Sequence, residues 1–195
     1  NLMADIFPEG GQLVYGLPSH FALKISDASG EEIISREAIL ISGSDTITRF
    51  KTNQQGLGKC MFTPLQGNKY EVLIKKTETD WQSFSLPEII DRGYTMLLDD
   101  ADPESISITV NTNWSPAESS CFLFVHCRQV LIQAISTQYK NGKAIFKLPK
   151  SDIGEGISHF TVFNVGRQPV MERLYFKIPE RLLKLNVSAN NETFK

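Results

Sequence analysis

The sequence predicts an all-β protein built from immunoglobulin-like sandwiches in tandem. Most of the 195 residues lie in short segments in which apolar and polar side chains alternate with a period of two, the pattern of half-buried strands. Glycine, proline, asparagine and aspartate separate these segments at the spacing typical of sandwiches. Because no segment resembles a crossover helix, parallel α/β folds such as the Rossmann fold are disfavoured.

The first half of the chain contains a complete set of candidate strands. They are rich in β-branched and aromatic residues, and they cover residues 13–15, 20–26, 38–42, 46–52, 59–63 and 69–75. The best signal for a helix lies in residues 85–90, where a serine and a proline precede two isoleucines, and it is one turn long before Gly93. We therefore predict a first sandwich over residues 1–90.

The second half of the chain repeats this organisation. Its candidate strands cover residues 94–98, 105–111, 120–126, 129–136, 143–148, 157–164 and 173–178, which predicts a second sandwich over residues 91–180. The alternation pauses between Pro87 and Gly93, so the joint is expected there. Beyond Pro179, an alternating apolar segment at 182–188 predicts the opening strand of a truncated third module within 181–195, as in a piece of a longer protein.

An internal repeat supports the tandem arrangement. Residues 58–64 (GKCMFTP) are similar to residues 142–149 (GKAIFKLP), and the two segments start 84 residues apart. This distance is close to the length of one immunoglobulin-like sandwich.

Several motifs in the sequence resemble those of a known family. These are Phe7, Pro8, Glu9, Gly10 and Gly11 before Leu13–Val14, then Gly56 with Gly58, Phe62 with Pro64, and finally Glu172 with Arg173. Together they resemble the tandem macroglobulin-like domains of large cell-envelope proteins in Gram-negative bacteria. The resemblance implies macroglobulin-type sandwiches in a periplasmic, outer-membrane-associated or cell-surface protein, and some relatives carry a TonB-dependent receptor plug domain. The Cys-Gly-Glu-Gln thioester motif of protease-trapping macroglobulins is absent from the sequence.

The motif residues also have structural explanations. We expect Gly10 and Gly11 to supply the positive φ angles of a two-residue hairpin turn, and Gly56 and Gly58 to flank a second tight connection. Prolines 8, 18 and 64 are expected to end strands, because proline has no N–H to donate to a sheet.

Composition and cysteine placement exclude several classes of protein. The formal net charge is −2, which gives no reason to expect a nucleic acid partner, and no apolar run has the length of a membrane span. Cys121 and Cys127 would lie on one face of a strand about 20 Å apart, too far for a disulfide. We expect these two residues and Cys60 to be buried free thiols.

The sequence gives little support for catalysis. His20, His126 and His159 lie on different predicted strands, and neither a Gly-x-Ser-x-Gly elbow nor a phosphate-binding loop accompanies them. We therefore expect no enzymatic activity and no cofactor.

Two features keep a binding role open. Asp99, Asp100, Asp102 and Glu104 form a weak candidate calcium site. The alternative is a solvated acidic turn, because the spacing matches no EF-hand loop and Pro103 already explains the turn. Four aromatic residues offer faces for sugar stacking, although core packing is the alternative; they are Trp81, Tyr94, Trp114 and Tyr139.

Taken with the resemblance, these observations predict non-catalytic structural and protein-interaction modules of a larger secreted or outer-membrane-associated bacterial protein. Neighbouring domains and other envelope proteins would be the partners. The alternative is a sandwich that binds a glycan or another surface molecule, and a row of exposed aromatic side chains would favour it.

Overall fold

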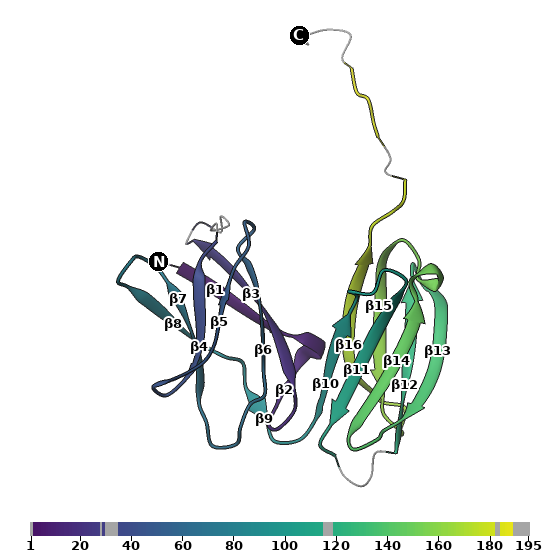
Figure 1. The fold of residues 1–195 in the computed structure, drawn as a ribbon. Coiled ribbons are helices and arrows are strands. Elements are labelled where there is room, and N and C mark those ends of the chain that lie inside the picture. The colour runs from purple at the N-terminus through teal and green to yellow at the C-terminus, as the bar shows by residue number, and fades with distance from the viewer. Residues whose placement is uncertain (1, 28, 30–34, 115–118, 182–183, 189–195) are drawn as a thin grey trace.

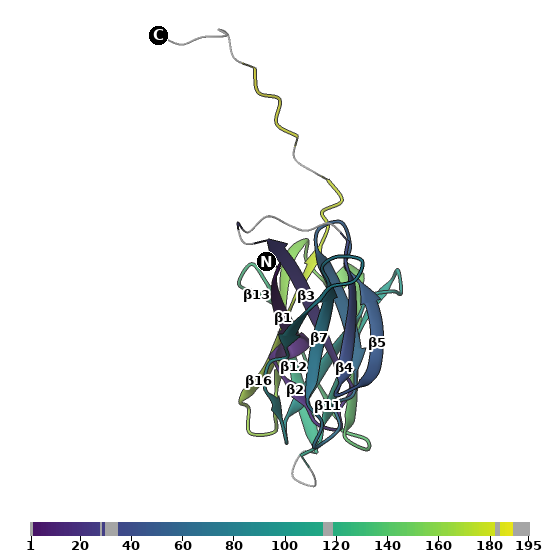
Figure 2. The same ribbon diagram turned by 90° about the vertical axis from the view of Figure 1, so that its left-hand side faces the viewer.

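The computed structural model describes residues 2–27, 29, 35–114, 119–181 and 184–188. Strands β1–β9 form one sandwich and β10–β16 form a second beside it (Figure 1). In the view of Figure 2 the first sandwich lies in front of the second, so the two stand side by side. The described helices are the 3-10 turns η1 (Glu9–Gly11) and η2 (Lys150–Asp152), and neither has the length of a membrane span. The predicted all-β, immunoglobulin-like fold is confirmed.

The first sandwich packs a three-stranded sheet against a four-stranded sheet, and all pairs within both sheets are antiparallel. The first sheet has the order β1 (Leu2–Pro8), β3 (Ser19–Asp27), β6 (Leu57–Phe62). The second has the order β5 (Asp45–Lys51), β4 (Glu37–Ser42), β7 (Tyr70–Lys75), β8 (Trp81–Ser85). This division of strands between two sheets is that of an immunoglobulin-like sandwich.

The second sandwich repeats the strand order of the first. Its three-stranded sheet has the order β10 (Tyr94–Asp99), β11 (Ser105–Thr112), β14 (Lys143–Pro149). Its four-stranded sheet has the order β13 (Val130–Gln138), β12 (Ser120–Cys127), β15 (Gly156–Phe163), β16 (Pro169–Lys177). Strands β6 and β14 occupy equivalent positions, and they carry the repeated sequence segments.

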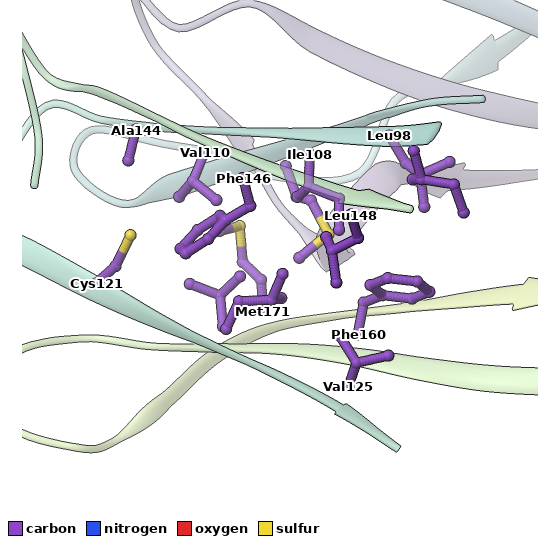
Figure 3. Close-up of a cluster of buried hydrophobic side chains, with 14 of the residues drawn as sticks. Leu98, Ile108, Val110, Cys121, Val125, Ala144, Phe146, Leu148, Phe160 and Met171 are labelled. Carbon is purple, nitrogen blue, oxygen red and sulfur yellow. The ribbon is translucent and has the colours of Figure 1, made fainter. Parts of the chain in front are cut away.

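Each sandwich has a core of its own. In the first, Phe21 is fully buried between edge-on contacts with Phe50 and Phe62. In the second, side chains of the two sheets point toward each other, among them Val110, Phe146 and Phe160 (Figure 3). The cysteines belong to these interiors, since all three are free and buried, as expected.

Some predicted elements were wrong or missing. Strands β1 and β8 were not predicted, and the single helical turn at residues 85–90 does not form. Instead, β9 (Ile89–Ile90) pairs in parallel with β2 (Leu13–Val14), and this pairing packs the partly buried Ile89 against the first core. The described residues 184–188 contain no strand and lie away from both sandwiches in the two views. The third module remains a prediction.

The turn between β12 and β13 carries unusual backbone strain. Cys127 pairs with Val130, so Arg128 and Gln129 form a two-residue hairpin loop, with φ angles of 49° and 66°. Such loops favour asparagine and glycine, which tolerate the left-handed region. Asn141 and Gly142 occupy the corresponding positions of another tight turn, with φ angles of 52° and 73°.

We expect the double substitution Arg128→Asn, Gln129→Gly to raise the free energy of unfolding by about 1 kcal/mol, because it removes this strain. Urea denaturation monitored by circular dichroism measures the change. An unchanged or lower stability would show that the Arg128 and Gln129 side chains make compensating contacts.

Candidate functional site

The most distinctive group of polar contacts lies at the junction between the two sandwiches. The turn η1 follows β1 and projects toward the second sandwich (Figure 1). The side chain of its first residue, Glu9, is only 7% exposed. One carboxylate oxygen lies 2.8 Å from His20 Nδ1 on β3. The other accepts hydrogen bonds from the Leu98 backbone N–H on β10 at 3.1 Å and from Arg173 Nε on β16 at 3.2 Å. Glu9 thus joins the two sandwiches.

Gly10 allows this close approach. Its φ angle is +79°, and a Cβ atom at this position would lie 3.1 Å from Met96 Cβ and 3.3 Å from Met171 Sδ. Both methionines belong to the core of the second sandwich. The positive φ predicted for Gly10 and Gly11 is present, at 79° and 92°, but the predicted hairpin is wrong, because β1 pairs with β3. Gly10 lets the chain run in close contact with the second sandwich, whereas a Cβ atom on Gly11 would meet nothing within 4 Å.

A second set of contacts holds the connecting segment. Asn113 follows β11 and donates from Nδ2 to the carbonyl oxygens of Tyr15, at 3.2 Å, and Asp91, at 2.7 Å. Its Oδ1 accepts a hydrogen bond from the Gly93 N–H at 3.0 Å. A Cβ atom on Gly93 would lie 2.9 Å from Ile90 Cδ1, so this segment is tightly packed as well as hydrogen-bonded. The junction is therefore anchored at two places.

The charge of Glu9 is stabilised despite its burial. Burial acts to raise its pKa, but the hydrogen bonds from His20, the Leu98 N–H and Arg173 outweigh that effect and hold the pKa below its ordinary value of 4.5. The native state therefore binds this proton less readily than the unfolded state does. Glu9 contributes its stabilisation above pH 4.5, and the contribution disappears as the pH falls through the lower native pKa.

We expect the stability of the protein to fall as the pH drops below about 4.5 partly for this reason, and the fall to be shallower in a Glu9→Gln variant. Urea unfolding at several pH values measures both slopes. Equal slopes in the two proteins would contradict the role assigned to Glu9, since the other carboxylates are common to both.

A groove of about 450 Å³ opens beside Glu9. Its walls include Phe7, which is 55% exposed, together with His20, Lys59 and Leu174. The described residues that line it include no serine, threonine or cysteine. The Glu9–His20 pair therefore has no hydroxyl or thiol nucleophile among the described residues that line this groove.

The structure separates the motif residues into two groups. Phe7, Pro8, Glu9, Gly10, Gly11, Glu172 and Arg173 come together at this groove. The others are internal to the first sandwich. Phe62 contacts Phe21 and Tyr70 edge-on, Gly58 leaves room for the ring of Phe50, and the Pro64 carbonyl accepts a hydrogen bond from Gly16 N–H. Gly56 has a φ angle of +69° in the turn before β6. Pro8 ends β1, as predicted.

The acidic segment 99–104 is a turn with internal partners. Asp99 accepts a hydrogen bond from Ala101 N–H, and Asp102 accepts bonds from Glu104 N–H and the Ser105 hydroxyl. Those bonds, with Lys147 at 3.6 Å, lower the pKa of Asp102 to about 2. The Lys150 ammonium donates to the carbonyl oxygen of Asp100. Among the described residues, no three His, Cys, Asp or Glu side chains are grouped so that they could hold a metal ion. Asp100 and Glu104 are therefore not part of such a group.

The aromatic residues proposed for sugar stacking do not form one platform. Tyr94 is buried, Tyr139 packs against the second core, and Trp81 is half-buried on β8 of the other sandwich. Trp114 is 43% exposed and lies under the Arg92 guanidinium, 5.8 Å from its ring centroid.

Two of the three histidines meet, which the sequence analysis missed. His126 and His159 are cross-strand partners on β12 and β15, and their rings stack with centroids 4.5 Å apart. His159 Nδ1 lies 2.7 Å from a carboxylate oxygen of Glu172 on β16. The pairing of the two strands brings these residues together, and no local pattern in the sequence predicts this pairing.

No protein-family model and no curated protein matches the chain. Among solved structures, the human OSCAR ligand-binding domain is similar, with 9% identity and a TM-score of 0.33, over 88% of this chain and 94% of that one. Invasin, a bacterial integrin-binding protein, matches with 14% identity and a TM-score of 0.35, over 92% of this chain and 40% of that one.

Chicken CNTN1 FN1–FN3 domains match with 8% identity and a TM-score of 0.35, over 90% of this chain and 64% of that one. TM-scores of this size do not place the chain in any of these families. The fold assignment rests on the order of the strands, and the macroglobulin resemblance remains an expectation.

Proposed function

We propose that this pair of modules is a non-catalytic structural and interaction unit of a larger protein, in which the junction holds the two sandwiches at one fixed angle. The observation that carries the proposal is the burial of Glu9 among donors from both modules. If the sandwiches separated, Glu9 would lose the Leu98 N–H and Arg173, and the Leu98 N–H would lose its acceptor. Buried polar groups are costly to leave without partners.

The surroundings of the junction support the same role. Gly10 and Gly93 are packed so closely that a methyl group would not fit at either position without displacement. Asn113 ties the connecting segment to both modules. A fixed angle lets a pair of modules present surfaces in a defined orientation, which suits a scaffold that contacts neighbouring domains and other proteins.

We extend this proposal to the kind of protein that contains the unit and to its location. The motifs from Phe7 to Gly11 and at Glu172–Arg173 resemble macroglobulin-type modules, and on that basis we place the unit in a secreted or outer-membrane-associated bacterial protein. Its location would be the periplasm or the cell surface. Identification of the neighbouring domains in the full-length gene product tests this assignment separately from the rigidity of the junction.

Backbone ¹⁵N relaxation tests the rigid scaffold directly. We expect amides of both sandwiches to report one common rotational diffusion tensor, because the modules tumble as one body. In Glu9→Ala, where of the two anchors only the Asn113 contacts remain, the two sandwiches should no longer share one tensor, whereas Glu37→Ala, which removes a half-exposed carboxylate on β4, should leave the tensor unchanged. Separate tensors in the unaltered protein would refute the fixed junction.

A further inference from the structure

The outward face of the second four-stranded sheet carries a cluster of aromatic side chains. On β12, Leu123 and Val125 point into the core and are fully buried, so the alternate residues Phe122 and Phe124 face away from it. Phe163 on β15 is the cross-strand partner of Phe122, and its ring lies 5.1 Å from that of Phe124. Phe124 is 38% exposed. An apolar cluster on a solvent-facing sheet surface is typical of a binding site.

Arg167 completes this cluster from the loop after β15. Its φ angle is +60°, a left-handed conformation that costs energy for a residue with a Cβ atom. The loop is closed by the bonds from Asn164 N–H to the Gln168 carbonyl and from Arg167 N–H to the Asn164 carbonyl. Gly166, which would tolerate the conformation, occupies the preceding position instead.

Together these four residues line an open cavity of about 420 Å³. Three of them contribute aromatic rings, and the fourth contributes a guanidinium group. No carboxylate in the described ranges lies within ion-pair distance of Arg167. The cavity therefore combines an apolar lining with a guanidinium group that has no ion-pair partner among the described residues.

We propose that this cavity, which we call the phenylalanine pocket (Phe122, Phe124, Phe163 and Arg167), binds a small aromatic anion. The rings would hold the planar apolar body of the ligand, and the guanidinium would pair with its carboxylate or sulfonate. The volume lies within the range of small-molecule sites, which are mostly apolar with a few polar groups that fix orientation. The side chains lining the pocket offer donors but no acceptor for sugar hydroxyls, so a glycan fits less well.

This inference does not depend on the rigid junction, because the pocket lies within the second sandwich. Two dyes that differ by one group test it: 8-anilinonaphthalene-1-sulfonate, which is an aromatic anion, and N-phenyl-1-naphthylamine, which lacks the sulfonate. Fluorescence titration of the folded protein gives the affinity for each. We expect Arg167→Gln to weaken binding of the sulfonate dye roughly fivefold and to leave the neutral dye unaffected. Phe124→Ala should weaken binding of both dyes.

Arg128→Gln is the matched control, because Arg128 is an exposed arginine at the tip of the same sheet and should not alter either titration. Thermal unfolding of each variant verifies that it is folded, and Phe163→Leu replaces Phe124→Ala if the latter is not. The proposal is overturned if the sulfonate dye does not bind, if Arg167→Gln leaves its affinity unchanged, or if that variant weakens both dyes equally.

Discussion

Replacing Glu9 by alanine is expected to lower the free energy of unfolding by about 3 kcal/mol. The substitution removes a buried carboxylate and leaves His20, the Leu98 N–H and Arg173 without their acceptor. The Arg173 side chain is 44% exposed, so water screens its part of the interaction, and most of the loss comes from the two more enclosed donors. Guanidinium chloride denaturation measures the change.

The control for this substitution is Glu37→Ala. Glu37 also lies near two cations, with Lys51 at 3.7 Å and Lys75 at 3.6 Å, but its side chain is 47% exposed. Exposed pairs contribute about 0–1 kcal/mol, so this variant should remain close to the unaltered protein. If both variants lost the same small amount, Glu9 would be an ordinary surface carboxylate and the junction would rest on other contacts.

Replacing Phe21 by alanine is expected to cost about 3–5 kcal/mol, because it leaves a cavity at the centre of the first sandwich. The Phe21 ring has no exposed area, and its centroid lies 6.1 Å from that of Phe50 and 5.9 Å from that of Phe62. Trp81 lies in the first sandwich and Trp114 follows β11 in the second, so single-tryptophan variants report on each module separately.

In Phe21→Ala, the fluorescence of Trp81 should report unfolding at a lower denaturant concentration than the fluorescence of Trp114 does. Phe176→Ala serves as the control, because Phe176 is 58% exposed and its removal should cost less than about 1 kcal/mol. A cost below about 1.5 kcal/mol for Phe21→Ala would mean that the first core collapses around the missing ring.

Most of the strands could be predicted from the sequence, because burial of one sheet face imposes a period of two. Strand β1 was missed because its outward residues include the exposed apolar side chains Met3 and Phe7, which hide the alternation. Strand β8 was missed because it is a short sheet edge whose sequence, WQSFS, is largely polar. Exposed apolar side chains on β1 and the short, polar sequence of β8 therefore weakened the signal.

The candidate site was only partly accessible to sequence reasoning. The resemblance singled out Glu9 and Arg173, but these residues are 164 positions apart, and their pairing depends on how two separately folded sandwiches pack. The phenylalanine pocket did leave a signal. Residues 121–125 (CFLFV) are apolar at every position, which indicates a strand that is apolar on its outward face as well as its inward face.

The distance distribution between two spin labels tests the fixed junction most directly. Cysteine substitutions at Asp45 on β5 and Gln138 on β13 place one label on an exposed site of each sandwich, and the native cysteines are buried. Burial raises the pKa of Cys60 to about 12, which keeps it a poorly reactive thiol. Pulsed electron paramagnetic resonance should give one narrow distribution in the unaltered background and a broad one in Glu9→Ala. A distribution that is already broad before the substitution would contradict a junction that holds the two sandwiches at one angle.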